Sequence, residues 1–171
     1  MLCPTKQTYL TKEGPIMTAN QVGRRLFVAA LVAGVVLAGA DGLHASHLGD
    51  GKKHKIVYQL DDSGVDKTRF VLNNIQNHVK GVGGSKNIEA LELVVFGPAL
   101  KNFVTKDMDA GVRQSLTALQ ADGMVFGACG NTMKGFNLTL DQLADGAKPL
   151  PQGGVVRVME LQEQGFAYIR P

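Results

Sequence analysis

Residues 124–133, MVFGACGNTM, contain a short apolar run that lies between Gly123 and Gly130. A run of this length with glycine at both ends is typical of a strand buried on both faces, as in a parallel sheet. It ends at Cys129, and the other cysteine of the chain is Cys3. Ligands of open parallel sheets bind beyond the carboxyl ends of the strands, where a glycine lets backbone approach closely. The sequence therefore predicts a solvent-reachable, functional thiol at Cys129, with a buried packing cysteine as the alternative.

The segments around this strand alternate between apolar strands and amphipathic helices. We expect strands at 55–60, 88–96, 124–129, 148–150 and 166–169, and helices at 66–80, 107–120, 139–143 and 154–165. Asp66 is the expected cap of the first helix, and Thr105 or Asp107 that of the second. Strands that alternate with helices predict a three-layer α/β/α sandwich with a mainly parallel sheet of about five strands and flavodoxin-like winding.

The first forty residues are typical of an export signal. Arg24 and Arg25 precede an uncharged run, 26–40, that is shorter than the roughly twenty apolar residues of a membrane span. We therefore expect residues 1–40 to be a cleaved signal peptide, with Met17 as a candidate true start. The arginine pair followed by Leu-Phe-Val resembles a twin-arginine signal. We therefore expect the protein to be periplasmic and to contact a membrane only if the signal stays uncleaved.

Residues 41–54 are predicted to form a flexible polar arm in front of the domain at 55–171. His44, His47, His54 and Asp50 lie on this arm, and we interpret them as solvated side chains rather than as metal ligands. Residues 1–40 contain four of the 18 basic residues and one of the 15 acidic residues, so the remainder has equal numbers of both. This balance gives no indication of a nucleic acid partner.

Four loops are expected to meet at the carboxyl edge of the sheet, at 61–64, 97–100, 129–134 and 151–154. A free thiol with a pKa of about 8.5 is mostly protonated at neutral pH, so it needs help to become a nucleophile. The candidate groups that stabilise the thiolate are the amides of Gly130 and Asn131 and the amine of Lys134. Gly97 belongs to the second of these loops.

Asp61 and Asp62 follow the first predicted strand. They form either a turn at the helix entry or a substrate or metal contact, and they oppose a thiolate if they face the sulfur. Two carboxylates in this loop argue against a bound flavin or nucleotide phosphate, which requires donors there. The motifs of serine hydrolases and zinc proteases are absent from the sequence, and no cofactor or metal is expected. His78 is expected at the other edge of the sheet, as a cation at the helix end.

Three stretches together resemble the DsrE/DsrF-like family. They are residues 126–132 (FGACGNT), 95–98 (VFGP) and the tail from Pro151-x-Gly153-Gly154-Val155 to 161–169 (LQEQGFAYI). The resemblance covers about 55–171. It implies a parallel α/β/α fold that assembles into homotrimers or homohexamers, and a cysteine, matched by Cys129, that carries sulfur as a persulfide in a relay.

The leading hypothesis is an exported persulfide carrier or sulfurtransferase-like protein. In it, Cys129 takes sulfane sulfur from a donor and passes it to an acceptor, where each is a protein or a small sulfur compound. The alternative is a non-catalytic oligomeric module that binds a small ligand at the carboxyl edge, where Cys129 only packs. A third hypothesis is a thiol redox sensor that forms bridges between subunits, because Cys129 has no partner cysteine within the domain.

Overall fold

The computed structural model describes residues 51–171, so the predicted signal peptide and most of the polar arm lie outside the described residues. Five strands form one sheet in which every neighbouring pair is parallel. Their order is β4-β3-β2-β1-β5. The strands are β1 (His54–Leu60), β2 (Ile88–Val95), β3 (Val125–Cys129), β4 (Ala147–Leu150) and β5 (Ala167–Ile169). Within residues 51–171, no helix is long and apolar enough to cross a bilayer.

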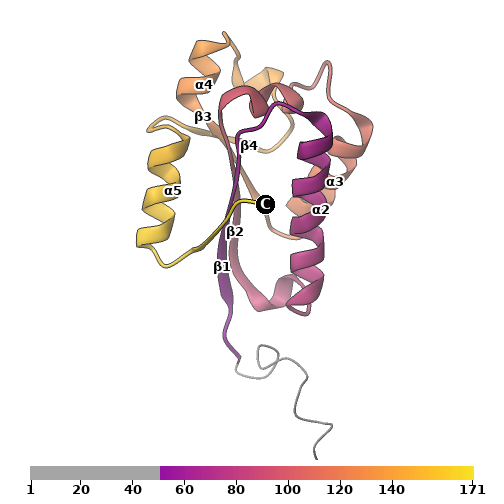
Figure 1. Cartoon of the computed structure of the whole chain (residues 1–171), viewed down its shortest axis with the longest axis vertical. Helices are drawn as coiled ribbons and strands as arrows, with labels where there is room; N and C mark the ends of the chain where they lie inside the picture. Colours follow the sequence, from indigo (N-terminus) through magenta and orange to yellow (C-terminus); the bar gives the residue numbers. More distant parts are fainter. Residues whose placement is uncertain (1–50) are drawn as a thin grey trace, which may run out of the picture. The chain divides into compact units, whose positions relative to one another are not determined.

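Helices cover both faces of this sheet, which confirms the predicted α/β sandwich. The helices α2 (Val65–Gly81) and α3 (Ala110–Ala121) pack together on one face, and α5 (Gly154–Glu163) covers the other (Figure 1). The short helix α4 (Gly130–Gly135) follows β3 at the carboxyl edge. Three 3₁₀ helices complete the described part of the chain: η1 (Ser85–Asn87), η2 (Gly97–Phe103) and η3 (Leu140–Gln142).

The strand order explains why the two faces are covered unequally. From β1 to β4 the chain moves across the sheet in one direction, and right-handed crossovers then place their helices on one face. The last connection runs back across the sheet, so α5 lies on the opposite face and brings β5 beside β1. The winding differs here from the flavodoxin order 2-1-3-4-5, in which the second strand takes the edge position next to the first.

Alternation along the strands divides the core into two clusters. The larger lies under α2 and α3 and includes Leu93 and Phe126, whose side chains are fully buried. The smaller lies under α5 and consists of Val57, Val94, Leu150, Val158 and Leu161. Because Phe126 and Ala128 face the larger cluster, Cys129 faces the side of α5.

Two predicted helix starts are wrong. The helix α2 begins at Val65 after Gly64, and no side chain, including that of Asp66, caps it. The cap of α3 is Asp109, whose carboxylate accepts from the N–H of Val112 at 3.0 Å. Neither Thr105 nor Asp107 takes this role, because η2 and the turn after it occupy the chain up to Asp107. The Thr105 hydroxyl instead donates to the carbonyl of Leu143.

His78 is not the helix-end cation that the sequence predicted. Its Nδ1 lies 2.7 Å from the hydroxyl of Tyr58, which is 3% exposed. Burial lowers the pKa of His78 below 6.5, and the charge of nearby His54 lowers it further. Burial also raises the pKa of Tyr58 to about 12, so the phenol keeps its proton. His78 is therefore neutral at pH 7 and accepts a hydrogen bond from Tyr58.

This arrangement predicts a loss of stability in mild acid. The pKa of His78 is lower in the folded chain than in the unfolded chain, so the unfolded chain binds more protons below about pH 6.5. Its contribution is complete above that pH and decreases as the pH falls. We expect His78→Gln, which keeps an acceptor for Tyr58, to show a shallower fall in the free energy of unfolding between about pH 7.5 and about pH 5.5. Urea denaturation across this range measures the effect, and parallel curves for the two proteins contradict it.

Candidate functional site

Cys129 lies at the junction of three elements. It is the last residue of β3, the N-cap residue of α4, and the register partner of Leu150 in β4. It is a free cysteine, and the residue is only 5% exposed. The thiol is therefore less accessible than the sequence predicted. The physical reason is that the end of β4 and the first turn of α5 pack against it.

Polar groups around the sulfur favour the thiolate. Burial raises the pKa of the Cys129 thiol, but hydrogen bonds oppose this effect. They come from the hydroxyl of Thr132 and from the amides of Thr132, Gly154 and Asn131, and together they lower the pKa of Cys129 below its ordinary value. The site thus combines low exposure with donors that stabilise a negative sulfur.

Gly97 acts on the thiol through Thr132. Its N–H donates to the Thr132 hydroxyl oxygen at 2.9 Å, which leaves the hydroxyl hydrogen of Thr132 for the sulfur of Cys129. Gly97 has φ +59°, in the left-handed region that favours glycine. The loop after β2 therefore orients a side chain that follows β3.

The absence of Cβ atoms lets the backbone close around the sulfur. A Cβ on Gly154 would lie 2.6 Å from Cδ1 of Phe96, and one on Gly130 would lie 2.9 Å from the carbonyl oxygen of Leu150. Gly153 has φ +97°, and a Cβ there would meet the side-chain amide of Asn131. With glycine at all three positions, the amino end of α5 reaches the thiol, where the helix dipole also favours a negative charge.

The structure brings together some of the predicted site residues and separates others. Asn131 donates its amide to the sulfur of Cys129, and Gly97 acts on it through Thr132. Gly130 follows Cys129 in the chain, but its amide is not among the groups that lower the pKa of the thiol. Lys134 lies in the last turn of α4, at the end of the helix away from the thiol. It therefore takes no place among the groups that lower the pKa of Cys129.

The two aspartates after β1 face another part of the edge. Asp61 forms an ion pair with Arg170 at 2.9 Å, because β5, which precedes Arg170, pairs with β1 on the side away from β2 and β3. Asp62 is exposed, and its charge also acts on Arg170 by raising its pKa. The carboxylates therefore leave the thiolate unopposed. Among residues 51–171, no group of three or more His, Cys, Asp or Glu residues is arranged to hold a metal ion.

Sequence reasoning missed Thr132 and Gly154. Thr132 is the third residue of α4, a position whose amide points toward an N-cap side chain. A threonine three residues after a strand-end cysteine was therefore an available signal. The loop at 151–154 was predicted to lie at the same edge, but the contact of Gly154 with the thiol had no local signal, since it depends on how β4 and α5 pack across the end of β3.

Comparisons with known proteins support the fold. A structure of a protein of unknown function, MTH1491 from Methanobacterium thermoautotrophicum, is 22% identical with a TM-score of 0.62, over 70% of this chain and 100% of that chain. The structure of the ychN protein from E. coli is 16% identical with a TM-score of 0.52, over 69% of this chain and 99% of that chain. No family model and no curated protein matches the sequence. The similarities establish a compact α/β fold.

The contacts of Thr132 generate a prediction about the thiol. Thr132→Val removes the hydroxyl that donates to Cys129 and nearly keeps the shape of the side chain. We expect the pKa of Cys129 to rise in this variant, while Thr132→Ser keeps the low value. The ultraviolet absorbance of the thiolate, followed against pH in a Cys3→Ser background, measures it. Equal titration curves for Thr132→Val and the parent protein would refute the assigned role.

Proposed function

We propose that this protein is an exported, DsrE/DsrF-like sulfur carrier that works through Cys129 without a cofactor. The observation that carries the proposal is a free thiol at the carboxyl edge of a parallel sheet, surrounded by donors that lower its pKa. The resemblance of residues 126–132 to the family cysteine motif supports the same chemistry. The donor is a persulfide or a polysulfide, and the acceptor is a protein thiol or a small thiol.

Two nucleophilic displacements describe the transfer. The Cys129 thiolate attacks the outer sulfur of a persulfide or polysulfide, the S–S bond of the donor breaks, and the donor leaves as a thiolate or shorter polysulfide. An acceptor thiolate then attacks the outer sulfur of the Cys129 persulfide, and Cys129 leaves as a thiolate. Sulfur moves without a net oxidant. The amides of Asn131, Thr132 and Gly154 favour both Cys129 as attacking thiolate and Cys129 as leaving group.

Mass spectrometry after incubation with polysulfide tests the proposal. The full chain in a Cys3→Ser background should gain the mass of one sulfur atom, and peptide mapping should place it on Cys129. A matched Cys129→Ser variant should gain none. Transfer is then measured by adding a thiol acceptor, which should restore the original mass. An equal adduct in Cys129→Ser, or no adduct in the parent protein, overturns the proposal.

The low exposure of Cys129 favours the alternative of a non-catalytic binding module. Four cavities lined by residues 51–171 lie at the amino edge of the sheet, between α2 and α3, beside η3, and between α3 and the loop before β4, and Cys129 lines none of these four. A non-catalytic binding module, in which the thiol only packs, fits this observation if its ligand binds in one of these cavities rather than at the predicted carboxyl edge. Alkylation separates the two functions, because a packing thiol resists reagent until the protein unfolds. The same burial disfavours a redox sensor that joins subunits through Cys129.

We also propose that the protein forms homo-oligomers through α5. Val155 is 69% exposed and Met159 is 50% exposed, and the two lie one helical turn apart on the outer side of α5. Val156 and Val125 add exposed apolar surface on the same side of the sheet. Within the described residues, α5 is the one helix on this side, and a second copy of the chain is the occupant that completes it. Homotrimers or homohexamers are the expected assemblies, from the family resemblance.

Charge on this helix should separate the subunits. Full burial of a valine or methionine side chain contributes about 1.5–3 kcal/mol, so Val155→Glu/Met159→Glu should weaken association at least about tenfold. Light scattering at several protein concentrations measures the assembly. Asn73→Glu/Asn77→Glu adds the same charge at the same spacing on α2 and should leave the assembly unchanged. A parent protein that is monomeric at every concentration excludes the interface.

A further inference from the structure

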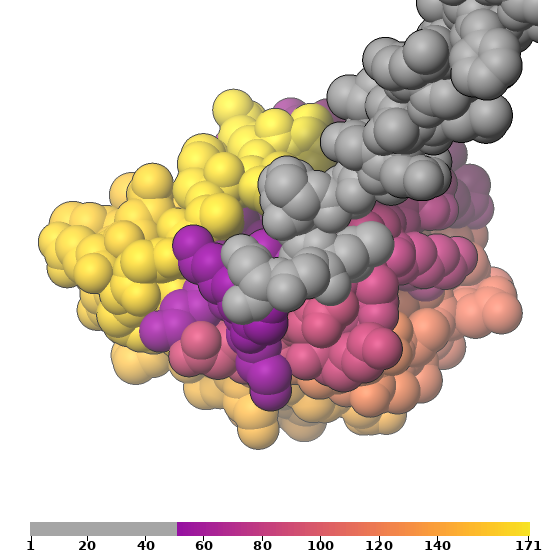
Figure 2. All heavy atoms as spheres, turned by 90° about the horizontal axis from the view of Figure 1, so that it is seen from below, coloured from indigo at the N-terminus to yellow at the C-terminus, as the bar shows by residue number. Residues whose placement is uncertain are grey.

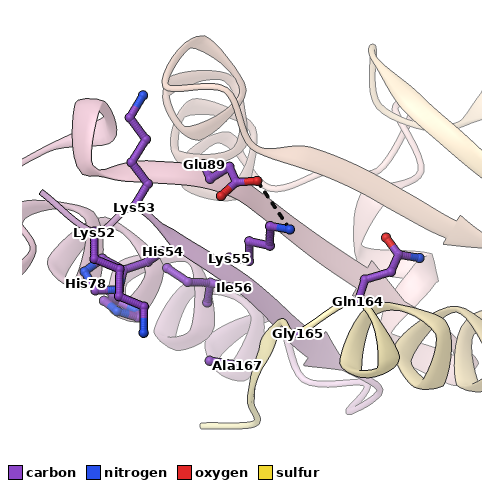
Figure 3. A pocket seen from close by; sticks show the side chains of 10 residues that line it. All are labelled: Lys52, Lys53, His54, Lys55, Ile56, His78, Glu89, Gln164, Gly165 and Ala167. Atoms are coloured by element: carbon purple, nitrogen blue, oxygen red, sulfur yellow. Dashed lines mark ion pairs between the residues drawn. The ribbon is translucent and has the colours of Figure 1, made fainter.

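A second candidate site lies at the amino edge of the sheet, opposite Cys129. A cavity of about 590 Å³ opens there between the start of β1, the end of α2 and the end of α5, and we call it the amino-edge pocket (Figure 3). Its lining residues are Lys52, Lys53, His54, Lys55, Ile56, His78, Glu89, Gln164, Gly165 and Ala167. Figure 2 views the molecule from this edge, where the beginning of β1 lies beside the beginning of β5. A volume of this size suits a small molecule.

The charge of the lining is strongly biased. Three of its residues are lysines, two are histidines, and one, Glu89, is acidic. The carboxylate of Glu89 pairs with Lys55 at 3.3 Å, so this acid is already neutralised within the pocket. Figure 3 shows this ion pair on one wall, with Lys52 extending past His54 and His78 on another and Lys53 pointing away from them. Lys52 and Lys53 precede β1, so compensation of a helix dipole does not account for them.

His78 presents a donor to this environment. The hydroxyl of Tyr58 is buried and lies 2.7 Å from Nδ1 of His78, and a buried phenol satisfies its O–H by donating it. Neutral His78 then carries its hydrogen on Nε2, the nitrogen on the other side of the ring. The ring therefore acts as a donor even before it binds a second proton.

We propose that the amino-edge pocket binds a small anion that carries a phosphate or sulfate group. Ammonium groups, imidazole N–H groups and the side-chain amide of Gln164 supply donors, and Ile56 and Ala167 supply apolar wall. The phosphate belongs either to a free metabolite-sized anion or to a lipid headgroup. Because β1 starts at this edge and β3 ends at the other, binding here is independent of Cys129 and of sulfur transfer.

The affinity should increase as the pH falls. An anion in the pocket faces His78 of α2, His54 of β1 and Lys52, which precedes β1. Lys55 and Glu89 form an ion pair with each other, and Tyr58 stays protonated. Protonation of His78 adds a positive charge, and a bound anion in turn favours that protonation. Proton uptake therefore accompanies binding.

Titration of the full chain with inorganic phosphate and with sulfate, followed by heteronuclear NMR at about pH 6 and about pH 8, tests the site. Saturable chemical-shift changes at Lys53, His54, His78 and Gln164 support it. For sulfate, whose charge is the same at both pH values, the affinity should be at least about tenfold higher at the lower pH. Lys52→Ala/Lys53→Ala should weaken binding at least about tenfold, and His78→Gln should remove most of the pH dependence. Lys106→Ala/Lys134→Ala removes the same charge elsewhere and should leave binding unchanged. Cys129→Ser should bind as the parent does.

A second arm identifies the source of the phosphate. Vesicles of phosphatidylcholine with or without phosphatidylglycerol are sedimented with each variant. The ligand is a lipid headgroup if the protein binds the anionic vesicles, if this binding depends on Lys52 and Lys53, and if free phosphate causes no saturable chemical-shift changes. Saturable shifts by free phosphate without vesicle binding assign it to a soluble anion. If neither ligand binds, or if Lys52→Ala/Lys53→Ala binds as tightly as the parent, the proposal is wrong.

Discussion

The close approach of two backbones at the end of β3 is the constraint on which the site depends. A side chain on Gly130 would collide with the carbonyl oxygen of Leu150. A side chain on Gly154, in the first turn of α5, would collide with the ring of Phe96. With glycine at both positions, the amides of α4 and α5 reach one sulfur. A larger residue at either position moves a backbone segment, and the donors then no longer converge. The chemistry of Cys129 is thus a consequence of packing.

The path of the chain across the sheet places this convergence on the less covered face. The strands from β1 to β4 follow one another across the sheet in one direction, so α2 and α3 lie on one face. The connection from β4 to β5 runs back across the sheet and places α5 on the other face. The cluster under α5 is correspondingly small. This face therefore carries both the thiol and the exposed apolar residues of α5, Val155 and Met159. Assembly of subunits through this face and chemistry at its carboxyl edge use the same helix.

The two edges of the sheet differ in their electrostatics. At the carboxyl edge, helix amino ends and a threonine hydroxyl stabilise a negative sulfur, and Asp61 is held away by Arg170. At the amino edge, three lysines and two histidines line a cavity. Among the described residues that line it, Glu89 is the one acidic residue. His78 remains neutral there because it is partly buried and lies near His54. A parallel sheet contributes to this polarity, because all strands run in one direction and the covering helices run in the opposite one, so that helix amino ends gather at the carboxyl edge.

Periodicity and turn residues were sufficient to predict the five strands, the three long helices, the parallel sheet and the position of Cys129 at a strand end, because these depend on neighbours in the chain. They did not predict α4 or η2, and the helix expected at 139–143 is the 3₁₀ helix η3. Local reasoning also placed Gly130 and Asn131 beside the thiol. The start of α3 at Asp109, the distant pairing of Asp61 with Arg170 and the neutral state of His78 were decided only by tertiary structure. So were the contact of Gly154 with Cys129 and the burial of the thiol. All but the start of α3 join residues from different strands or helices, and the sequence does not state which elements become neighbours or how closely their ends approach.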